Sequence, residues 1–302
     1  MEILRFQPRM GRAVARCYNA LIEPVPYCHP VPAERFASMG VLAHRGLREE
    51  TVMVARAQGG EIVGFVHVGL ALTPVEDWQP REGTAVIRFL SCRPGQRSVG
   101  KALLERAERW ARSRAAKEMW AWHQHFRYRF YHFPCAHLSE RIAHVGALFG
   151  MAGYREQESE LYLAWPEFAL PKPEPPAVEF DLRSEWQQGP LGPRLVVWAV
   201  QGEENVGRCC MDRGQASPAP DAPDWCYCDG LWVREHVQGK RLGTFLLTTG
   251  LREMHKAGCR HAAISTASTN YRAALFYTNL GYRFADRTVS FAKDLSHEQS
   301  PA

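Results

Sequence analysis

The feature that most constrains the fold of this 302-residue chain is an internal repeat. Gly100-Lys101-Ala102-Leu103-Leu104 aligns with Gly243-Thr244-Phe245-Leu246-Leu247 at a shift of 143 (243 minus 100), and Gly153-Tyr154-Arg155 aligns with Gly281-Tyr282-Arg283 at a shift of 128 (281 minus 153). A repeated pattern of this length indicates two structural units of one kind. The smaller second shift predicts about 15 extra residues in the first half, in the stretch from His123 to Glu140.

Both halves show the same succession of a hairpin, a further strand and an amphipathic helix, judged from alternating and helical spacing of apolar residues. In the first half these elements are expected at residues 51–57, 61–70 and 84–92, with the helix opening at Gly100. In the second half they are expected at residues 194–200, 205–210 and 227–233, with the helix opening at Gly243. A strand over 2–7 and a helix over 12–21 precede the first set, whereas only residues 178–182 precede the second.

Residues 166–177 contain five prolines in twelve positions, a composition that favours an extended connector. The sequence therefore predicts a first domain over 1–165, a proline-rich linker over 166–177 and a second domain over 178–296. A polar loop over 211–224 is expected between two strands of the second domain, as a substrate-side flap or an irregular excursion.

Composition narrows the class of protein. A net charge of +5 suits an anionic ligand but falls short of the clustered basicity of a dedicated nucleic-acid binder. Nine cysteines, an odd number, favour reduced thiols, and Cys209, Cys210, Cys226 and Cys228 lack the spacing of a typical zinc site. Without a recognisable leader or a long apolar run, a cytoplasmic protein with no membrane and no metal is expected.

A basic, glycine-containing loop joins a strand to a helix in the second half. At such a junction the first helical N–H groups lack helical partners and lie at the positive end of the helix dipole, which favours binding of a pyrophosphate. Taken alone, this signal also fits an ordinary helix start. The loop residues are Gln238, Gly239, Lys240, Arg241, Leu242, Gly243 and Thr244.

The downstream segment carries a more specific pattern, N-x-x-A-x-x-F/L-Y-x-x-x-G-F/Y, matched by Asn270, Ala273, Phe276, Tyr277, Gly281 and Tyr282. With this segment, the sequence resembles the GNAT N-acetyltransferase superfamily. The family's phosphate-loop pattern, Q/R-x-x-G-x-G/A, is also matched, except that Arg241 stands at the first glycine position. The resemblance implies an α+β fold of two tandem GNAT-like domains, each with a mixed, mostly antiparallel sheet flanked by helices.

The resemblance also implies residue roles. The loop from Gln238 to Thr244 would hold the pyrophosphate of acetyl-CoA or another short acyl-CoA, and Asn270 would bond the pantetheine or the adjacent chain. A backbone N–H near Val233 would polarise the thioester carbonyl. Tyr277 would protonate the departing thiolate, since a phenol can donate toward a thiolate; the alternative is a core aromatic.

Acylation of an amine needs the nucleophile uncharged, so an acid side chain is expected near the strand that precedes the loop. Asp229 is the first candidate for this base and Glu235 the second; Asp229 also reads as a turn acid before Gly230. The implied function is acyl-CoA-dependent N-acyltransfer, most simply of acetyl, to a small-molecule or protein amine in a ternary complex. The alternative is a non-catalytic acyl-CoA-binding or protein-interaction module.

The first half lacks the key side chains. Phe149 stands at the tyrosine position, Ile142 at the asparagine position, and the loop before Gly100 is two residues shorter. Because phenylalanine cannot donate a proton, this half is interpreted as a degenerate domain without catalysis. Its inserted stretch mixes aromatics with Arg and His, which suits an acceptor pocket, a base-stacking surface, a metal cluster of His123, His125 and His132, or simply an internal cover.

Overall fold

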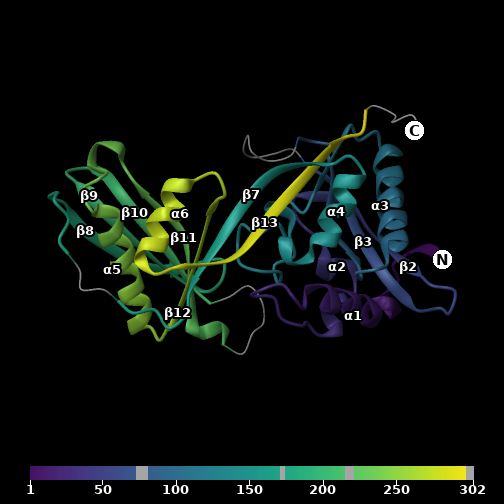
Figure 1. Ribbon diagram of the computed structural model, residues 1–302, viewed down its shortest axis with the longest axis horizontal. Helices are drawn as coiled ribbons and strands as arrows, with labels where there is room; N and C mark the ends of the chain where they lie inside the picture. The colour runs from purple at the N-terminus through teal and green to yellow at the C-terminus, as the bar shows by residue number, and fades with distance from the viewer. Residues whose placement is uncertain (73–80, 171–173, 215–220, 297–302) are drawn as a thin grey trace. The chain divides into compact units, whose positions relative to one another are not determined.

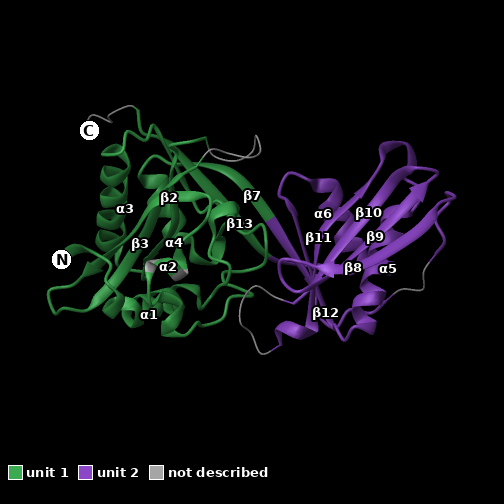
Figure 2. Cartoon of the chain, turned by 180° about the vertical axis from the view of Figure 1, so that it is seen from behind, with its two compact units in different colours: residues 1–160, 286–302 green, residues 161–285 purple. Residues whose placement is uncertain are grey.

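The structure, a computed structural model, describes residues 1–72, 81–170, 174–214 and 221–296. Linker residues 171–173 and loop residues 215–220 lie outside this part of the chain. The chain forms two compact units: unit 1 comprises Met1–Glu160 and Asp286–Ala302, and unit 2 comprises Leu161–Ala285. Figure 1 labels the elements and Figure 2 colours the two units. No helix in the described ranges is long and apolar enough to cross a bilayer.

Unit 1 combines one sheet with helices that carry apolar stripes. Its strands are β1 (Glu2–Arg5), β2 (Leu47–Arg56), β3 (Ile62–Ala71), β4 (Ala85–Cys92), β5 (Glu118–Ala121), β6 (Leu138–Ser139), most of β7 (Arg155–Trp165) and most of β13 (Arg283–Asp294). Its helices are α1 (Gly11–Ile22), α2 (Met39–Leu42), α3 (Arg97–Arg112) and α4 (Ala143–Met151). The expected strands and the helix near Gly100 therefore form, with bounds shifted by a few residues.

The sheet of unit 1 is mixed. The neighbours β1–β2, β2–β3 and β3–β4 are antiparallel, β4 and β5 are parallel, and β13 pairs antiparallel with both β5 and β6. The parallel register runs from Ala85 opposite Met119 to Ile87 opposite Ala121, although β4 continues to Cys92.

Helices cover both faces of this sheet. A Cβ on Gly64 of β3 would lie 3.1 Å from Leu103 of α3. The next residue, Phe65, stacks on Phe89 of β4 with ring centroids 5.5 Å apart, and Tyr18 of α1 lies 5.1 Å from Phe89. Because successive strand residues point to opposite faces, α3 and α1 lie on opposite sides of the sheet.

Unit 2 repeats this plan with a shorter front. Its strands are β8 (Asp181–Gln188), β9 (Pro193–Gln201), β10 (Glu204–Arg213), β11 (Trp225–Val233) and β12 (His261–Ala267), and its helices are α5 (Leu242–Lys256) and α6 (Tyr271–Leu280). Strands β8 to β11 pair antiparallel in order, and β11 and β12 pair parallel. The expected α+β class with mixed, mostly antiparallel sheets is thus confirmed.

The compact units do not follow the expected boundaries of 1–165, 166–177 and 178–296. The described part of the linker belongs to unit 2, where Phe168 N–H donates to Arg260 O (2.9 Å) and Ala177 N–H to Lys240 O (3.0 Å). The end of the chain returns to unit 1, where Phe291 of β13 lies opposite Ala121 of β5. Strand pairing over a long sequence separation, which a local pattern does not encode, sets these limits.

The inserted aromatic stretch of the first half lies inside unit 1. Tyr128, Tyr131 and Phe133 are each no more than 2 % exposed. Tyr128 stacks on Phe89 of β4 with ring centroids 5.2 Å apart, and Tyr131 lies 5.3 Å from Trp122. Burial of large aromatics contributes strongly to stability, so this stretch forms part of the unit 1 core.

Candidate active site

The repeat found in the sequence has a counterpart in the packing. A Cβ on Gly64 would lie 3.1 Å from both Val99 and Leu103 of α3, and a Cβ on Gly207 would lie 3.5 Å from Leu242 and 2.7 Å from Leu246 of α5. All three pairs (64/207, 99/242 and 103/246) share the offset that relates Gly100 to Gly243. In both units a strand glycine therefore allows the following helix to pack closely on the sheet.

Unit 2 contains a cleft of about 550 Å³ between the end of β11, the start of α5 and the start of α6. Its described lining contains two arginines, Arg241 and Arg272, and no carboxylate. A cavity of this size that is positive and partly apolar suits an organic anion. Of the expected site residues, those that line it are Val233, Gln238, Gly239, Arg241, Leu242, Gly243, Thr244, Asn270 and Tyr277.

The cleft opens where two parallel strands stop pairing. The register of β11 with β12 ends at Cys228 opposite Ile264, while β11 continues to Val233. Arg234 N–H donates to Val206 O (2.9 Å), and Val233 lies opposite Gly207. Because residues alternate in an antiparallel ladder, the N–H and C=O of Val233 point away from β10, toward the side where β12 has separated.

The start of α5 supplies further donors. Phe245 N–H bonds Arg241 O (3.0 Å), so the N–H groups of Leu242, Gly243 and Thr244 precede the first helical hydrogen bond. Arg241 is the N-cap residue, and its φ of 65° is left-handed. That conformation explains why the family pattern has glycine here, since a side chain costs about 1–2 kcal/mol at such an angle. The Arg241 guanidinium pairs with Glu174.

Gln238 and Arg272 link the two walls of the cleft. Gln238 Nε2 donates to Val233 O (2.8 Å), and Arg272 Nη1 donates to Gln238 Oε1 (2.8 Å). The guanidinium of Arg272 is thereby held at the cleft. Sequence reasoning did not select Arg272, because it occupies a variable position of the motif. The available signal was its spacing, since Arg272 lies one turn before Phe276 on the same helix face.

Asn270 and Tyr277 sit at the two ends of the cleft wall that α6 forms. Asn270 is the N-cap residue, and its Oδ1 accepts from Ala273 N–H (3.1 Å), which leaves its amide N–H groups for a ligand. Tyr277 is 6 % exposed and lines the cleft. Burial, together with the nearby Cys228 and Cys209 thiols, raises the pKa of the Tyr277 hydroxyl, so the phenol stays protonated at neutral pH.

Three expected residues lie outside the cleft lining. Asp229 sits at a bulge of β11 and pairs with Arg194 (2.5 Å), which also pairs with the buried Asp212 (2.7 Å). Glu235 is exposed at the start of a short 3-10 helix. Lys240 is exposed, and its carbonyl accepts from the linker. The structure therefore gathers the cofactor-binding candidates and Tyr277, but not the two acid candidates.

The corresponding place in unit 1 is closed. A Cβ on Gly100, the counterpart of Gly243, would overlap Leu148 Cδ1 of α4 and lie 2.8 Å from Cys92 Sγ. His144 Nε2 lies 2.9 Å from the Cys92 carbonyl, in the place where Gln238 bonds Val233. Phe149, which stands at the position of Tyr277, is fully buried. A smaller hollow of about 250 Å³ remains, and its lining mixes two carboxylates, of Glu105 and Glu108, with three cationic side chains, of Arg97, Lys101 and Lys293.

A metal site needs several ligating side chains arranged around one point. Across the ranges that the structure describes, no group of three or more His, Cys, Asp or Glu side chains is arranged to hold a metal ion. His123 and His132, two of the histidines considered above, are buried, with Nε2 atoms 3.5 Å from the carboxylates of Glu158 and Asp286 respectively.

The fold and the cleft define a chain of two α+β units in tandem, of which unit 2 keeps an open cleft at splayed parallel strands. The family model described as "Acetyltransferase (GNAT) family" matches residues 14–133 and 144–282, which is more than half of the chain. The chain therefore belongs to the GNAT acetyltransferase family. No curated protein matches it.

Two solved structures share the fold over almost the whole chain. A tandem GNAT protein from the clavulanic acid biosynthesis pathway, solved without AcCoA, is 16 % identical, with 99 % of each chain covered and a TM-score of 0.68. A GCN5-related N-acetyltransferase from Sphaerobacter thermophilus is 15 % identical, with 97 % of this chain and 95 % of that chain covered and a TM-score of 0.64. At these identities the likeness establishes the fold alone.

Proposed function

We propose that unit 2 is an acyl-CoA-dependent N-acyltransferase that moves acetyl, or another short acyl group, to an amine, and that unit 1 is a degenerate copy without catalysis. One observation carries the proposal: a single cleft combines the helix N-terminus of Leu242–Thr244, the outward N–H of Val233 and the buried hydroxyl of Tyr277. Family membership supports the same reaction class.

The cleft fits the donor by charge and shape. The N–H groups of residues 242–244 and the guanidinium of Arg272 would hold a pyrophosphate, because oriented N–H groups and arginine forks both favour phosphate oxygens. Arg241 would join them by exchanging its pair with Glu174 for the phosphate. Gly243 leaves room for this close approach, since its nearest atoms would lie 3.6 Å and 3.9 Å from a Cβ. Asn270 would bond the amide-containing arm of the cofactor.

The residues then serve a direct transfer in a ternary complex. Bound acyl-CoA supplies a thioester, whose carbonyl oxygen would accept the N–H of Val233. The amine nitrogen forms a bond to the carbonyl carbon, the carbon–sulfur bond breaks, and Tyr277 donates its proton to the departing thiolate. Asp229 and Glu235 lie outside the lining, so either would receive the amine proton through water, and Tyr277 is reprotonated from solvent.

The acceptor is proposed only by class, as a small-molecule or protein amine. Asp229 lies on β11, the strand that leads into the cleft, and its charge is balanced by Arg194 of β9. The reaction is proposed for the cytoplasm, where acyl-CoA and reduced thiols coexist; the nine cysteines are free.

The experiment supplies acetyl-CoA with a panel of amines to the full chain and measures released thiol. Tyr277→Phe should lower kcat by about 100-fold or more, the usual range for loss of a general acid, with unchanged affinity for acetyl-CoA. Tyr282→Phe, the same change in another buried aromatic of unit 2, should stay within about twofold because its hydroxyl does not line the cleft. Equal rates for wild type and Tyr277→Phe would remove Tyr277 from the mechanism.

A non-catalytic acyl-CoA-binding module is the second candidate, favoured by the ion pair that engages Asp229 and by the position of Glu235 outside the cleft. This candidate predicts calorimetric binding of acetyl-CoA without thiol release for any amine. Absence of any acetyl-CoA binding would contradict both candidates.

A further inference from the structure

Unit 1 contains a second large cavity, distinct from the cleft of unit 2. It measures about 560 Å³ and lies among the residues after α2, the middle of β4 and the inserted aromatic stretch. No carboxylate among the described residues lines it, whereas five arginines do: Arg35, Arg45, Arg88, Arg127 and Arg129. We call this cavity the basic pocket.

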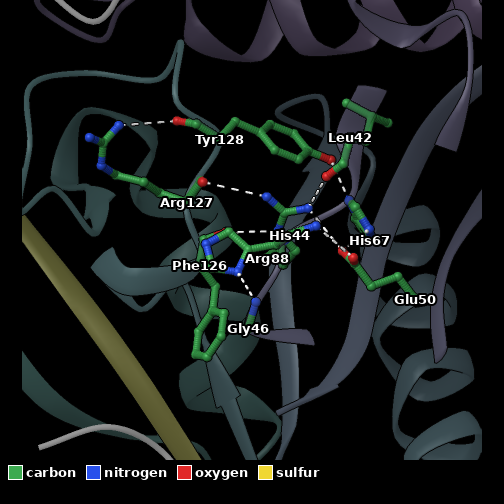
Figure 3. Close-up of polar contacts among 9 residues, drawn as sticks. All are labelled: Leu42, His44, Gly46, Glu50, His67, Arg88, Phe126, Arg127 and Tyr128. Carbon is green, nitrogen blue, oxygen red and sulfur yellow. Dashed lines mark hydrogen bonds and ion pairs between the residues drawn. The ribbon is translucent and has the colours of Figure 1, made fainter. Parts of the chain in front are cut away.

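The floor of the basic pocket is built around a buried arginine. Arg88 is 4 % exposed and pairs with Glu50 (2.9 Å). Its guanidinium also donates to the carbonyls of Leu42 and Phe126, the latter at 2.7 Å. Figure 3 shows that Arg88 lies between the chain segments that carry these carbonyls. Since removal of a buried partner is costly, this network holds both segments of the pocket wall in place.

A second layer of contacts fixes Glu50. His67 Nε2 lies 3.1 Å from Glu50 Oε2, and His67 Nδ1 lies 2.9 Å from the Tyr128 hydroxyl (Figure 3). Burial raises the pKa of the Glu50 carboxyl, but the contacts with His67 and Arg88 outweigh it and hold this pKa below its usual value. The ionised carboxylate balances the charge of Arg88, so the floor is preorganised and close to neutral.

The rim is not balanced in this way. Arg35, Arg45 and Arg129 are exposed, and none of them pairs with a carboxylate in the described ranges. Like charges around one cavity repel one another, and a bound anion relieves that repulsion. The positive charge around the pocket also acts on His44. Burial, together with nearby cationic groups that include Arg88 and Arg129, lowers the pKa of the His44 imidazole to about 4.

The wall and the size of the cavity define the ligand further. Tyr128 and Phe130 both line the basic pocket and stack with ring centroids 5.2 Å apart, which gives it an apolar side. Its volume lies within the range of about 300–1,000 Å³ that is common for small-molecule sites. Arginine forks match the oxygen geometry of phosphate and carboxylate groups.

We propose that the basic pocket binds a small organic anion that carries two or more phosphate or carboxylate groups on a carbon framework. This site is separate from the acyl-CoA cleft, and it gives the degenerate unit a binding role of its own. Neither the fold nor the proposed acyl transfer requires anion binding at the basic pocket, so this binding can be tested independently of the reaction in unit 2.

The test is calorimetric titration of the full chain at 0.15 M salt with two probes, inorganic pyrophosphate and citrate, which separate phosphate from carboxylate recognition. At least one probe should bind saturably. The double variant Arg35→Ala/Arg129→Ala should weaken that binding about 10-fold or more, since two charge-assisted contacts to the anion are lost. Arg45→Ala alone, a milder change, should weaken it about threefold to tenfold.

Two controls assign the site. Arg12→Ala/Arg155→Ala removes the same charge from exposed arginines outside the pocket lining and should leave affinity within about twofold. The titrations are repeated in the Arg272→Ala background, which weakens any binding of pyrophosphate at the unit 2 cleft, and the loss caused by Arg35→Ala/Arg129→Ala should persist there. Equal weakening in both double variants, or no effect of Arg35→Ala/Arg129→Ala in this background, would overturn the proposal. The proposal would also be overturned if neither probe bound saturably. Binding of only an acidic peptide or an RNA oligomer would count as that result.

Discussion

Gly100 of unit 1 and Gly243 of unit 2 occupy the same position of the repeat, but their surroundings differ. A Cβ on Gly243 would meet Val233 at 3.6 Å and Phe276 at 3.9 Å, which are ordinary contacts. A Cβ on Gly100 would overlap Leu148 and lie 2.8 Å from Cys92. Cys92 corresponds to Val233, because these residues pair with Gly64 and Gly207 respectively.

A unit can therefore have this fold without having the cleft. Leu148 and Phe276 are related by the same offset that relates Phe149 to Tyr277 and Gly153 to Gly281. In unit 1 the helix that carries Leu148 packs directly against the start of α3, and His144 of the same helix engages the end of β4. In unit 2 the corresponding space is open, with arginines and no carboxylate in its described lining. Unit 1 thus has the same sheet and helices, and side chains fill the space that the cleft occupies in unit 2.

The strongest test of this comparison fills the cleft of unit 2. Gly243→Leu should weaken acetyl-CoA binding by about 100-fold or more, equivalent to about 2.7 kcal/mol, because the side chain would occupy the phosphate approach. Calorimetry measures the affinity and thermal unfolding monitors stability. Gly150→Leu, an equally large change at an exposed position of α4 with nothing within 4 Å of the built Cβ, should leave binding unchanged. Similar affinities for the two variants would show that the cleft is not the binding site.

A second test measures the stability of the protein in place of its affinity for acetyl-CoA. Gly100→Ala should be less stable than Gly243→Ala by about 1 kcal/mol, since Leu148 Cδ1 and Cys92 Sγ, the ends of two packed side chains, must shift to admit the Cβ. Gly243→Ala should leave stability within about 0.5 kcal/mol, because its Cβ makes only ordinary contacts. Urea unfolding of both variants measures the difference. A Gly100→Ala protein as stable as Gly243→Ala would mean that unit 1 is not closely packed there.

A third test concerns the arginine that sequence reasoning did not select. Arg272→Ala should weaken acetyl-CoA binding by about 5- to 10-fold, because one charge-assisted contact is lost while the helix start remains. Arg272→Lys, which keeps the charge but not the fork that donates to Gln238, should recover part of the affinity. Unchanged affinity in the alanine variant would mean that Arg272 does not contact the phosphates and that residues 238–244 alone bind them.

The smallest expected effect lies at the unusual loop position. Arg241→Gly should be more stable than Arg241→Ala by about 1 kcal/mol, because both lose the pair with Glu174 but only glycine adopts a φ of 65° without strain. Chemical denaturation of the two variants isolates the backbone contribution. Equal stabilities would mean that the loop relaxes to another conformation in the alanine variant.

Local patterns predicted much of this molecule. The repeated glycine-containing segments placed α3 and α5, and the offset between Gly153 and Gly281 aligned Phe149 with Tyr277. These features depend on residues close together in sequence or on direct repetition, which is why the sequence was sufficient for them.

The features that were not predicted depend on long-range packing. The alternating residues of β13 do not reveal which strands it joins, and its pairing with β5 and β6 assigns Asp286–Asp294 to unit 1. The closure at Gly100 depends on where α4 settles, and the pairing of Asp229 with Arg194 joins two strands that are distant in sequence. Arg88 could have been noticed in the sequence, because it is a charged residue within the mainly apolar strand β4.

The most direct test of the central claim is the number of acetyl-CoA molecules bound per chain, measured by calorimetric titration of the wild type and of Gly243→Leu. We expect one site per chain in the wild type and no measurable site in the variant. Two sites in the wild type, or one site that survives Gly243→Leu, would mean that unit 1 also binds the cofactor and that closure at Gly100 does not prevent binding.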